Sequence, residues 1–157
     1  MDEKKTLTIA VQSGATNLDA RQATDATSAR LLRLMTLGLV RLDETQTHVP
    51  EAAKSFKKVN DTTYRFTLKE LTFHDGTKLK ASHVKRLYDT IRDPDYNSPL
   101  RGLFKGIEAI ETPDEKTVVF KLAEKNPFFL NLSVGSSCSP CIAEEVNVEP
   151  WRVSPSS

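Results

Sequence analysis

The chain has 157 residues, of which 38% are hydrophobic and 27% are charged, a composition typical of a folded domain. Its 22 basic and 21 acidic residues give a net charge of +1, which offers no electrostatic reason to expect nucleic acid or an anionic membrane as a partner. No apolar run approaches the roughly 20 residues of a membrane span. Residues 1–5 lack the apolar stretch of a signal peptide, so we expect either a cytosolic protein or a leader that is not included.

The first third of the chain predicts a strand, a helix and a second strand. Residues 7–11 alternate between apolar and polar side chains, the period of a half-buried strand. A helix is expected to begin near Thr27, with Asp25 or Thr27 as its N-cap. Gly38 is expected to end it in the left-handed conformation, before a strand over residues 39–42. The apolar face of this helix is expected to contain Leu31, Leu34, Met35 and Leu37.

The middle of the chain predicts a hairpin and the principal amphipathic helix. Residues 50–53 favour a short helical turn after proline, and residues 57–68 a hairpin around Asn60, Asp61 and Thr62. Gly76 suits a turn that requires positive φ. The helix is expected to end at Asp93, because the residue before a proline avoids the α region. Its apolar face is expected to contain Ala81, Val84, Leu87, Tyr88 and Ile91.

The last third predicts another hairpin and an irregular end. Residues 107–110 and 118–122 are expected to pair, with the turn at residues 112–115. Residues 128–130 form a short apolar segment. Residues 135–157 lose the alternation and are expected to form an irregular tail, at a truncation or cloning boundary.

Residues that could carry chemistry are few. Cys138 and Cys141 have the spacing of a redox dithiol or of half a zinc site. No thioredoxin-like pattern surrounds them, and the histidines are scattered, so bystander thiols are the favoured interpretation and a thiol redox enzyme is a remote alternative. His74 and Asp75 are adjacent and would point to opposite faces of a strand, so Asp75 is assigned to a turn. We expect no catalytic residue, no metal site and no cofactor.

Short motifs follow one another in a specific order over residues 6–133. They are residues 17–20, 33–43, 49–56, 64–68, 73–77, 81–84, 93–94, 98–100 and 117–122. In this order they resemble the N-terminal part of the family 5 extracellular solute-binding proteins, the peptide and nickel receptors of ABC importers. Departures from the family pattern are Ala20 for proline, Phe56 for tryptophan, and Lys80 for a threonine N-cap, the last costing ~1 kcal/mol.

The resemblance implies a fold of the α+β type within the α/β class: a mixed, mostly antiparallel sheet with two main helices. Residues 1–134 would be part of lobe I of a periplasmic binding protein type II fold, in which two lobes close on a ligand by a hinge. An acidic residue that holds the ligand's amino group in peptide receptors lies in the other lobe and has no counterpart here.

The resemblance also implies four ligand-binding positions. The backbone of Thr24, Asp25 and Ala26 would pass the ligand in an extended form and pair with it like an added strand. Leu100 would face the cleft where relatives often carry an aromatic ring. Ordinary loop packing is the alternative for all four positions. The acidic Asp25 leaves cationic ligands or nickel chelates open.

The implied function is the substrate-binding component of an ABC importer that captures oligopeptides or dipeptides, without enzymatic activity. Its partners would be a peptide or other small solute and the ABC permease in the membrane. Its location would be periplasmic or otherwise extracytoplasmic. The alternatives are a nickel, haem or oligosaccharide receptor of the same family, or a truncated interaction domain that no longer serves transport.

Overall fold

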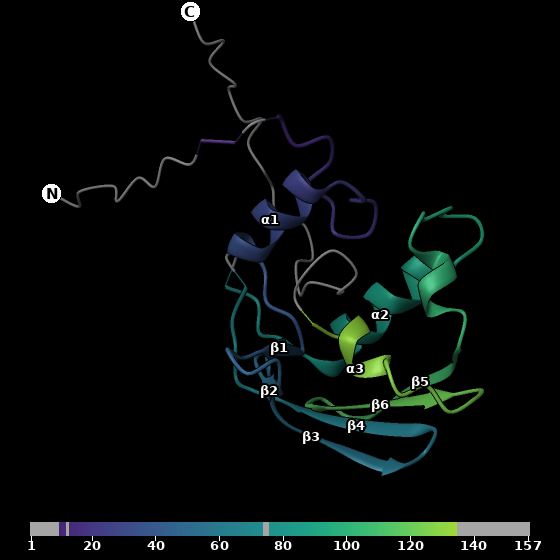
Figure 1. Cartoon of the computed structure of the whole chain (residues 1–157). Coiled ribbons are helices and arrows are strands. Elements are labelled where there is room, and N and C mark those ends of the chain that lie inside the picture. Colours follow the sequence, from purple (N-terminus) through teal and green to yellow (C-terminus); the bar gives the residue numbers. More distant parts are fainter. Residues whose placement is uncertain (1–9, 12, 74–75, 135–157) are drawn as a thin grey trace, which may run out of the picture.

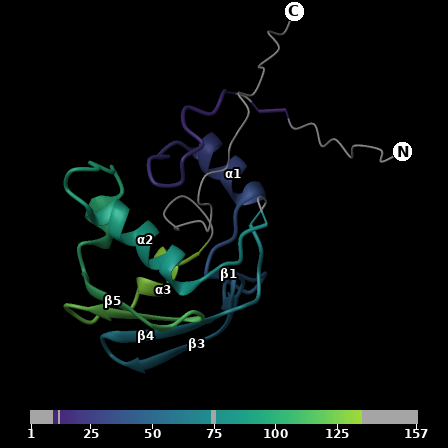
Figure 2. The same cartoon turned by 180° about the vertical axis from the view of Figure 1, so that it is seen from behind.

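The structure is a computed structural model that describes residues 10–11, 13–73 and 76–134 (Figure 1). In chain order the elements are α1 (Ala26–Met35), β1 (Val40–Leu42), β2 (His48–Pro50), β3 (Ala53–Asn60), β4 (Thr63–Leu68), α2 (Ala81–Arg92), the 3-10 helix η1 (Arg101–Phe104), β5 (Ile107–Asp114), β6 (Thr117–Leu122) and α3 (Phe129–Leu132). The four longer strands form one layer, α2 and α3 lie over one face of it, and α1 lies farther from the sheet in both views (Figures 1 and 2).

The main sheet has the strand order β3-β4-β6-β5, and every neighbouring pair in it is antiparallel. β1 and β2 form a separate antiparallel hairpin. A parallel bridge joins Val40 to Val134. The expected fold class, a mixed and mostly antiparallel sheet with two main helices, is therefore confirmed.

The core lies between the sheet and α2, because both elements present one apolar face. The alternation expected of strands is visible in β4, where every second side chain is buried. In β6 the same alternation holds except at Val119, which is also buried. Phe120 is fully buried and its ring contacts those of Tyr88, Phe66 and Phe129, at centroid distances of 4.8, 5.5 and 5.3 Å. On α2 the buried residues are Ala81, Val84, Tyr88 and Ile91, as the periodicity predicts, and Leu87, also expected on this face, is partly buried against the core.

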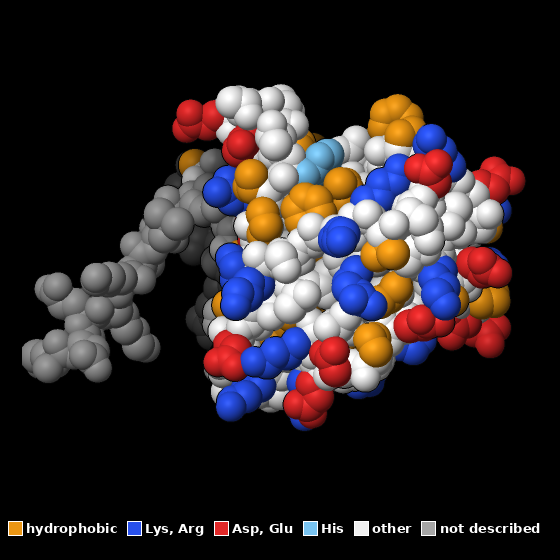
Figure 3. Space-filling view, turned by 90° about the horizontal axis from the view of Figure 1, so that it is seen from below, with side chains coloured by type: hydrophobic (Ala, Val, Ile, Leu, Met, Phe, Trp, Pro, Cys, Tyr) orange, Lys and Arg blue, Asp and Glu red, His pale blue; other side chains and the backbone are white. Residues whose placement is uncertain are grey.

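The opposite face of the sheet carries charged side chains of both signs. Lys57 and Arg65 lie opposite each other on β3 and β4, and Glu111 pairs with Lys121 at 2.5 Å on β5 and β6. Seen from below, this side of the molecule shows Lys and Arg interspersed with Asp and Glu (Figure 3). A mixed surface of this kind gives no strong field of one sign.

The helix α1 begins where the sequence predicts, with Asp25 as its N-cap. Among its described side chains, the buried apolar ones are Ala29 and Leu32, with 8% and 6% of their surface exposed, whereas Leu37 is 43% exposed. The prediction that Leu37 belongs to the buried face is therefore wrong. Leu37 follows the C-cap, Thr36, so it lies outside the helix, and the helical period that assigned it to the buried face does not apply to it.

Two further predictions, at Gly38 and at residues 50–53, are wrong. Gly38 does not adopt positive φ, because the Thr36 N–H and hydroxyl already bind the Leu32 carbonyl oxygen and end the helix. Gly38 instead donates its N–H to Glu51 Oε2 at 2.7 Å. Residues 50–53 form no helical turn, because the N–H groups of Glu51 and Ala53 both donate to the Leu39 carbonyl oxygen.

The other turns are closer to expectation. The hairpin over β3 and β4 forms as predicted, and Gly76 has a φ of +89°. The β5–β6 turn is displaced: β5 continues to Asp114, whose Oδ1 accepts from the Lys116 N–H at 2.8 Å, so the chain reverses at Glu115 and Lys116. Lys80 is the N-cap of α2, and its N–H donates to His83 Nδ1 at 3.1 Å, a partner that the sequence prediction did not include.

Three predictions fall wholly or mostly outside the described residues. They are the strand over residues 7–11, of which Ala10 and Val11 are described and belong to no strand, the His74–Asp75 pair, and the Cys138–Cys141 pair in the expected tail. Within the described ranges, no helix combines the length and apolarity that crossing a bilayer would require, and no group of three or more potential metal ligands occurs.

Candidate functional site

The segment before α1 is held against that helix by a buried serine. Ser28 is fully buried, and its Oγ accepts from the N–H groups of Thr16 and Asn17 at 3.1 and 3.2 Å. The Ser13 and Thr27 hydroxyls lie 3.1 Å apart in a further hydrogen bond. The loop that carries the candidate residues therefore has a defined path on its N-terminal side.

Asp25 is fixed at the start of α1. Its φ and ψ, −89° and 152°, are extended, and its Oδ1 accepts from the Ser28 N–H at 2.8 Å. Its Oδ2 accepts from the Thr16 hydroxyl. Hydrogen bonds from the Ser28 hydroxyl, the Thr16 hydroxyl and the Ser28 N–H hold the pKa of Asp25 well below its usual range. Both carboxylate oxygens are thus engaged within the chain, which argues against Asp25 as a side-chain ligand for a cation.

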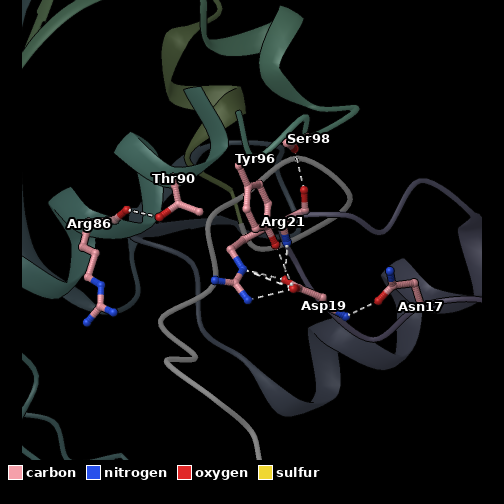
Figure 4. Close-up of polar contacts among 7 residues, drawn as sticks. All are labelled: Asn17, Asp19, Arg21, Arg86, Thr90, Tyr96 and Ser98. Atoms are coloured by element: carbon pink, nitrogen blue, oxygen red, sulfur yellow. Dashed lines mark hydrogen bonds and ion pairs between the residues drawn. The ribbon is translucent and has the colours of Figure 1, made fainter. Parts of the chain in front are cut away.

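Before Thr24 the chain makes a turn that is bound to the segment following α2 (Figure 4). The N–H groups of Gln22 and Ala23 donate to the Asp19 carbonyl oxygen at 2.9 and 2.8 Å. The Arg21 guanidinium binds the Asp19 carboxylate through two nitrogens, Nε to Oδ1 at 2.9 Å and Nη2 to Oδ2 at 2.8 Å. The same Oδ2 accepts from the Tyr96 hydroxyl at 3.1 Å.

These contacts determine the ionisation of Asp19. Partial burial alone would raise the pKa of Asp19, but the hydrogen bonds and charge of Arg21 and the hydrogen bond from Tyr96 outweigh it, so the pKa lies below the ordinary value. The Arg21 guanidinium also lies over the Tyr96 ring, 5.2 Å from its centroid. The Asp19 carboxyl group is therefore ionised at neutral pH and pairs with the Arg21 guanidinium as a charged group.

Ser98 joins the two segments that contain the candidate residues. Its hydroxyl donates to the Arg21 carbonyl oxygen at 2.5 Å, and its Oγ accepts from the Leu100 N–H at 3.2 Å. Leu100 itself packs in the hydrophobic core with 6% of its surface exposed. Its side chain therefore offers little surface to a ligand, although the segment that contains it lies beside the turn before Thr24.

Thr24 and Ala26 are exposed. Within the described part of the chain, neither the N–H nor the C=O of Thr24 has a hydrogen-bond partner. The Asp25 carbonyl oxygen, by contrast, already accepts from the Ala29 N–H at 3.0 Å in the first turn of α1. Of the three consecutive residues expected to pair with a ligand, Thr24 has both backbone groups available.

The sequence interpretation missed the residues that hold this site in place. Asp19 and Ser98 lie inside motifs that carried the family resemblance, and Tyr96 lies two residues before Ser98. Nothing in the local sequence links Asp19 to Tyr96, because they are 77 residues apart. Only the joint presence of an aspartate in the first motif and a tyrosine just before Ser98 could have indicated the contact.

Comparison with known proteins places the chain in a defined family. Residues 47–151 match the family model described as bacterial extracellular solute-binding proteins, family 5 middle. The match continues into residues 135–151, where no family motif was identified from the sequence.

Similar curated proteins are much longer than the chain. It is 34% identical over 134 residues to the glutathione-binding protein GsiB of Shigella boydii, which covers 83% of the chain and 26% of that protein. It is 37% identical over 90 residues to a Brucella ovis protein named as an ABC transporter peptide-binding protein, covering 57% of the chain and 17% of the relative. The chain therefore spans about a sixth to a quarter of the length of these relatives.

Similar solved structures share the fold. The murein tripeptide binding protein MppA of Escherichia coli has a TM-score of 0.77 at 22% identity, over 90% of this chain and 31% of that one. AgaA of A. tumefaciens R10, solved with agropinic acid, has a TM-score of 0.73 at 27% identity, over 82% of this chain and 27% of that one. The chain thus shares its fold with part of each of these larger proteins.

Proposed function

Because the chain belongs to family 5 of the bacterial extracellular solute-binding proteins, we propose that it captures peptides outside the cytoplasm and delivers them to an ABC permease. The names of its relatives support a peptide ligand: GsiB is named for glutathione and MppA for a murein tripeptide. The mechanism is equilibrium binding with closure of two lobes, and no covalent bond is made or broken.

The observation that carries the proposal is the state of Thr24. This residue is exposed, and its N–H and C=O are unpaired within the described residues, while the turn before it and the helix after it are anchored. An extended peptide can pair with such a residue through main-chain hydrogen bonds, as in strand addition. Because every peptide has the same backbone groups, this pairing gives affinity without selecting a side chain.

The other candidate positions take supporting roles. Asp25 holds the helix that follows Thr24, because its carboxylate is occupied by Ser28 and Thr16. Ala26 exposes a small side chain at the start of α1, which leaves room for a ligand backbone to approach. Leu100 contributes the packing beneath the segment rather than a large contact surface.

A second candidate ligand is a small acidic solute that is not a peptide. The structural neighbour AgaA was solved with agropinic acid, so the shared fold is not restricted to peptides. The described residues favour a peptide, because the groups left available at Thr24 are one donor and one acceptor of the backbone, the pair that a strand-like ligand needs.

The experiment is a calorimetric titration of the intact protein with trialanine and with glutathione, in three forms: unchanged, Thr24→Ala and Thr24→Pro. We expect Thr24→Ala to keep peptide affinity within about twofold, because the backbone is unchanged. Thr24→Pro removes the N–H and is expected to weaken binding at least about tenfold. The proposal is contradicted if neither peptide binds, or if proline and alanine have the same effect.

A further inference from the structure

We propose that Asp19, Arg21, Tyr96 and Ser98 form a polar latch that positions Thr24, so that these four residues set ligand affinity without contacting the ligand. This inference rests on the proposed function of Thr24. The latch is shown in Figure 4, where the Tyr96 and Ser98 side chains reach the turn that contains Asp19 and Arg21.

The latch joins two parts of the molecule that are distant in sequence. Both Tyr96 and Ser98 lie 77 residues from their partners, in the segment that directly follows α2. α2 packs on the main sheet through its buried face, so this segment starts from an element of the hydrophobic core. The turn containing Asp19 and Arg21, on the other side, leads directly to Thr24.

Among the described residues, the hydrophobic core cluster does not include the turn or α1. The hydrophobic core cluster contains no residue before Leu39. Ala23, Ala29 and Leu32 are buried, with 4%, 8% and 6% exposure, but they lie outside that cluster. Hydrogen bonds and an ion pair are directional, whereas apolar contacts are not, so the latch is suited to fix the position of a backbone segment.

Several polar atoms of the latch are bound to one another. Asp19 receives Arg21 Nε, Arg21 Nη2 and the Tyr96 hydroxyl, and its Oδ1 also accepts from the Arg21 N–H at 2.9 Å. The Arg21 guanidinium is stacked over Tyr96, and the Arg21 carbonyl oxygen takes the Ser98 hydroxyl. Because the Asp19 carboxylate and the Arg21 carbonyl oxygen are engaged within the chain, the latch acts on a ligand through the turn.

The path from latch to ligand is short. The Ser98 hydroxyl holds the Arg21 carbonyl oxygen, and the Ala23 N–H donates to the Asp19 carbonyl oxygen at 2.8 Å. Thr24 is the next residue. A displacement of the turn therefore moves the N–H and C=O of Thr24 directly, while α1 remains held by its own cap at Asp25.

The test uses the intact protein and the peptide trialanine, with two single variants. Ser98→Ala deletes the hydroxyl that holds the Arg21 carbonyl oxygen, and Tyr96→Phe deletes only the bond to Asp19 while keeping the ring under Arg21. Tyr96→Phe removes one hydrogen bond, and Ser98→Ala removes two, because the Ser98 Oγ also accepts from the Leu100 N–H. Each variant is expected to weaken trialanine binding about threefold to tenfold. The matched control is Thr90→Val, because the Thr90 hydroxyl also donates to a carbonyl oxygen, that of Arg86 at 2.8 Å within α2 (Figure 4). It is expected to leave affinity within about twofold.

A thermodynamic cycle separates positioning from general destabilisation. Each latch variant is combined with Thr24→Pro, which removes the N–H, one of the two Thr24 backbone groups that the latch positions. We expect Ser98→Ala and Tyr96→Phe to have a clearly smaller effect on affinity in that background, because coupled residues are not additive. Equal losses in both backgrounds would overturn the latch.

Failure of the latch and failure of the proposed function give different results. If trialanine binds and Thr24→Pro weakens it, but the latch variants match Thr90→Val, the latch is overturned and the proposed function stands. If trialanine and glutathione both fail to bind the unchanged protein, both ideas are overturned. Should Thr24→Pro not fold, hydrogen exchange of the Thr24 amide is measured instead, in the Ser98→Ala and Thr90→Val variants with and without trialanine. Faster exchange in trialanine-bound Ser98→Ala than in trialanine-bound Thr90→Val supports the latch. Equal exchange in the two bound variants overturns it.

Discussion

Asp25 accepts a hydrogen bond from the Ser28 N–H at 2.8 Å and thereby caps the helix that it precedes. The Thr16 hydroxyl binds the other carboxylate oxygen, so the same side chain also fixes the loop before the helix. The family resemblance marked Asp25 as a ligand position. In the structure its carboxylate defines where α1 starts, which in turn fixes the C-terminal side of Thr24.

The first prediction concerns this cap. Asp25→Ala removes both contacts, and we expect the melting temperature to fall by about 2–4 °C. Asn is as good an N-cap as Asp, so Asp25→Asn serves as the control and is expected to keep most of the stability. Thermal unfolding followed by circular dichroism makes the comparison. Equal melting temperatures for the alanine and asparagine variants would show that the cap does not contribute.

The second prediction concerns pH. Asp19 and Asp25 both have pKa values below the ordinary value in the folded state. A carboxylate of this kind stabilises the fold above its unfolded pKa of about 4, and that contribution is lost as the pH falls through the folded value. We therefore expect the melting temperature to decline steadily below about pH 4.

The control for the pH prediction is again Asp25→Asn, which keeps the cap but cannot titrate. Its melting temperature is expected to decline less steeply in acid than that of the unchanged protein. A parallel decline in the two proteins would mean that the Asp25 carboxylate is not held in its charged form by Ser28 and Thr16.

The third prediction concerns the core. Phe120 is fully buried against three aromatic rings, so Phe120→Ala is expected to cost about 3–5 kcal/mol of unfolding free energy. Phe128→Ala is the matched control, because Phe128 is 68% exposed and its loss is expected to be within about 0.5 kcal/mol of neutral. Urea unfolding measures both. Similar urea midpoints for the two variants would contradict the placement of Phe120 at the centre of the core.

The fourth prediction concerns Gly76. Its φ of +89° disfavours any side chain, so Gly76→Ala is expected to cost about 1–2 kcal/mol although nothing lies within 4 Å of an added Cβ. Gly102 has equally open surroundings and no positive φ, so Gly102→Ala is expected to be nearly neutral or slightly stabilising. The difference in urea midpoint between the two variants isolates the backbone effect. No difference would mean that residue 76 tolerates an L side chain.

Local patterns predicted those elements whose stability is decided locally. The β3–β4 hairpin, the buried face of α2 and the Asp25 cap depend on alternation, helical periodicity and a capping side chain, all of which are properties of neighbouring residues. The predictions failed where a distant strand captured the backbone. Gly38 and the segment after Pro50 were interpreted by local preference, but the Leu39 carbonyl oxygen binds Glu51 and Ala53 and draws both segments into pairing.

The candidate site shows the same division. Thr24 could be proposed from the resemblance and is exposed with unpaired backbone groups in the described structure. The contact between Asp19 and Tyr96 could not be proposed, because it joins residues from two motifs that have no common period or spacing. The burial of Leu100 was also unforeseen, because a single apolar residue in an irregular segment gives no indication of which way it faces.

The central claim is that the backbone of Thr24 pairs with an extended peptide, and amide hydrogen exchange tests it most directly. The intact protein is measured with and without saturating trialanine, and exchange is followed at Thr24 and, for comparison, at Thr45, whose N–H already donates to Asp43 Oδ1 at 2.8 Å. The account predicts that the peptide slows exchange at Thr24 at least about tenfold and leaves Thr45 unchanged. Bound peptide with no change in exchange at Thr24 would contradict it.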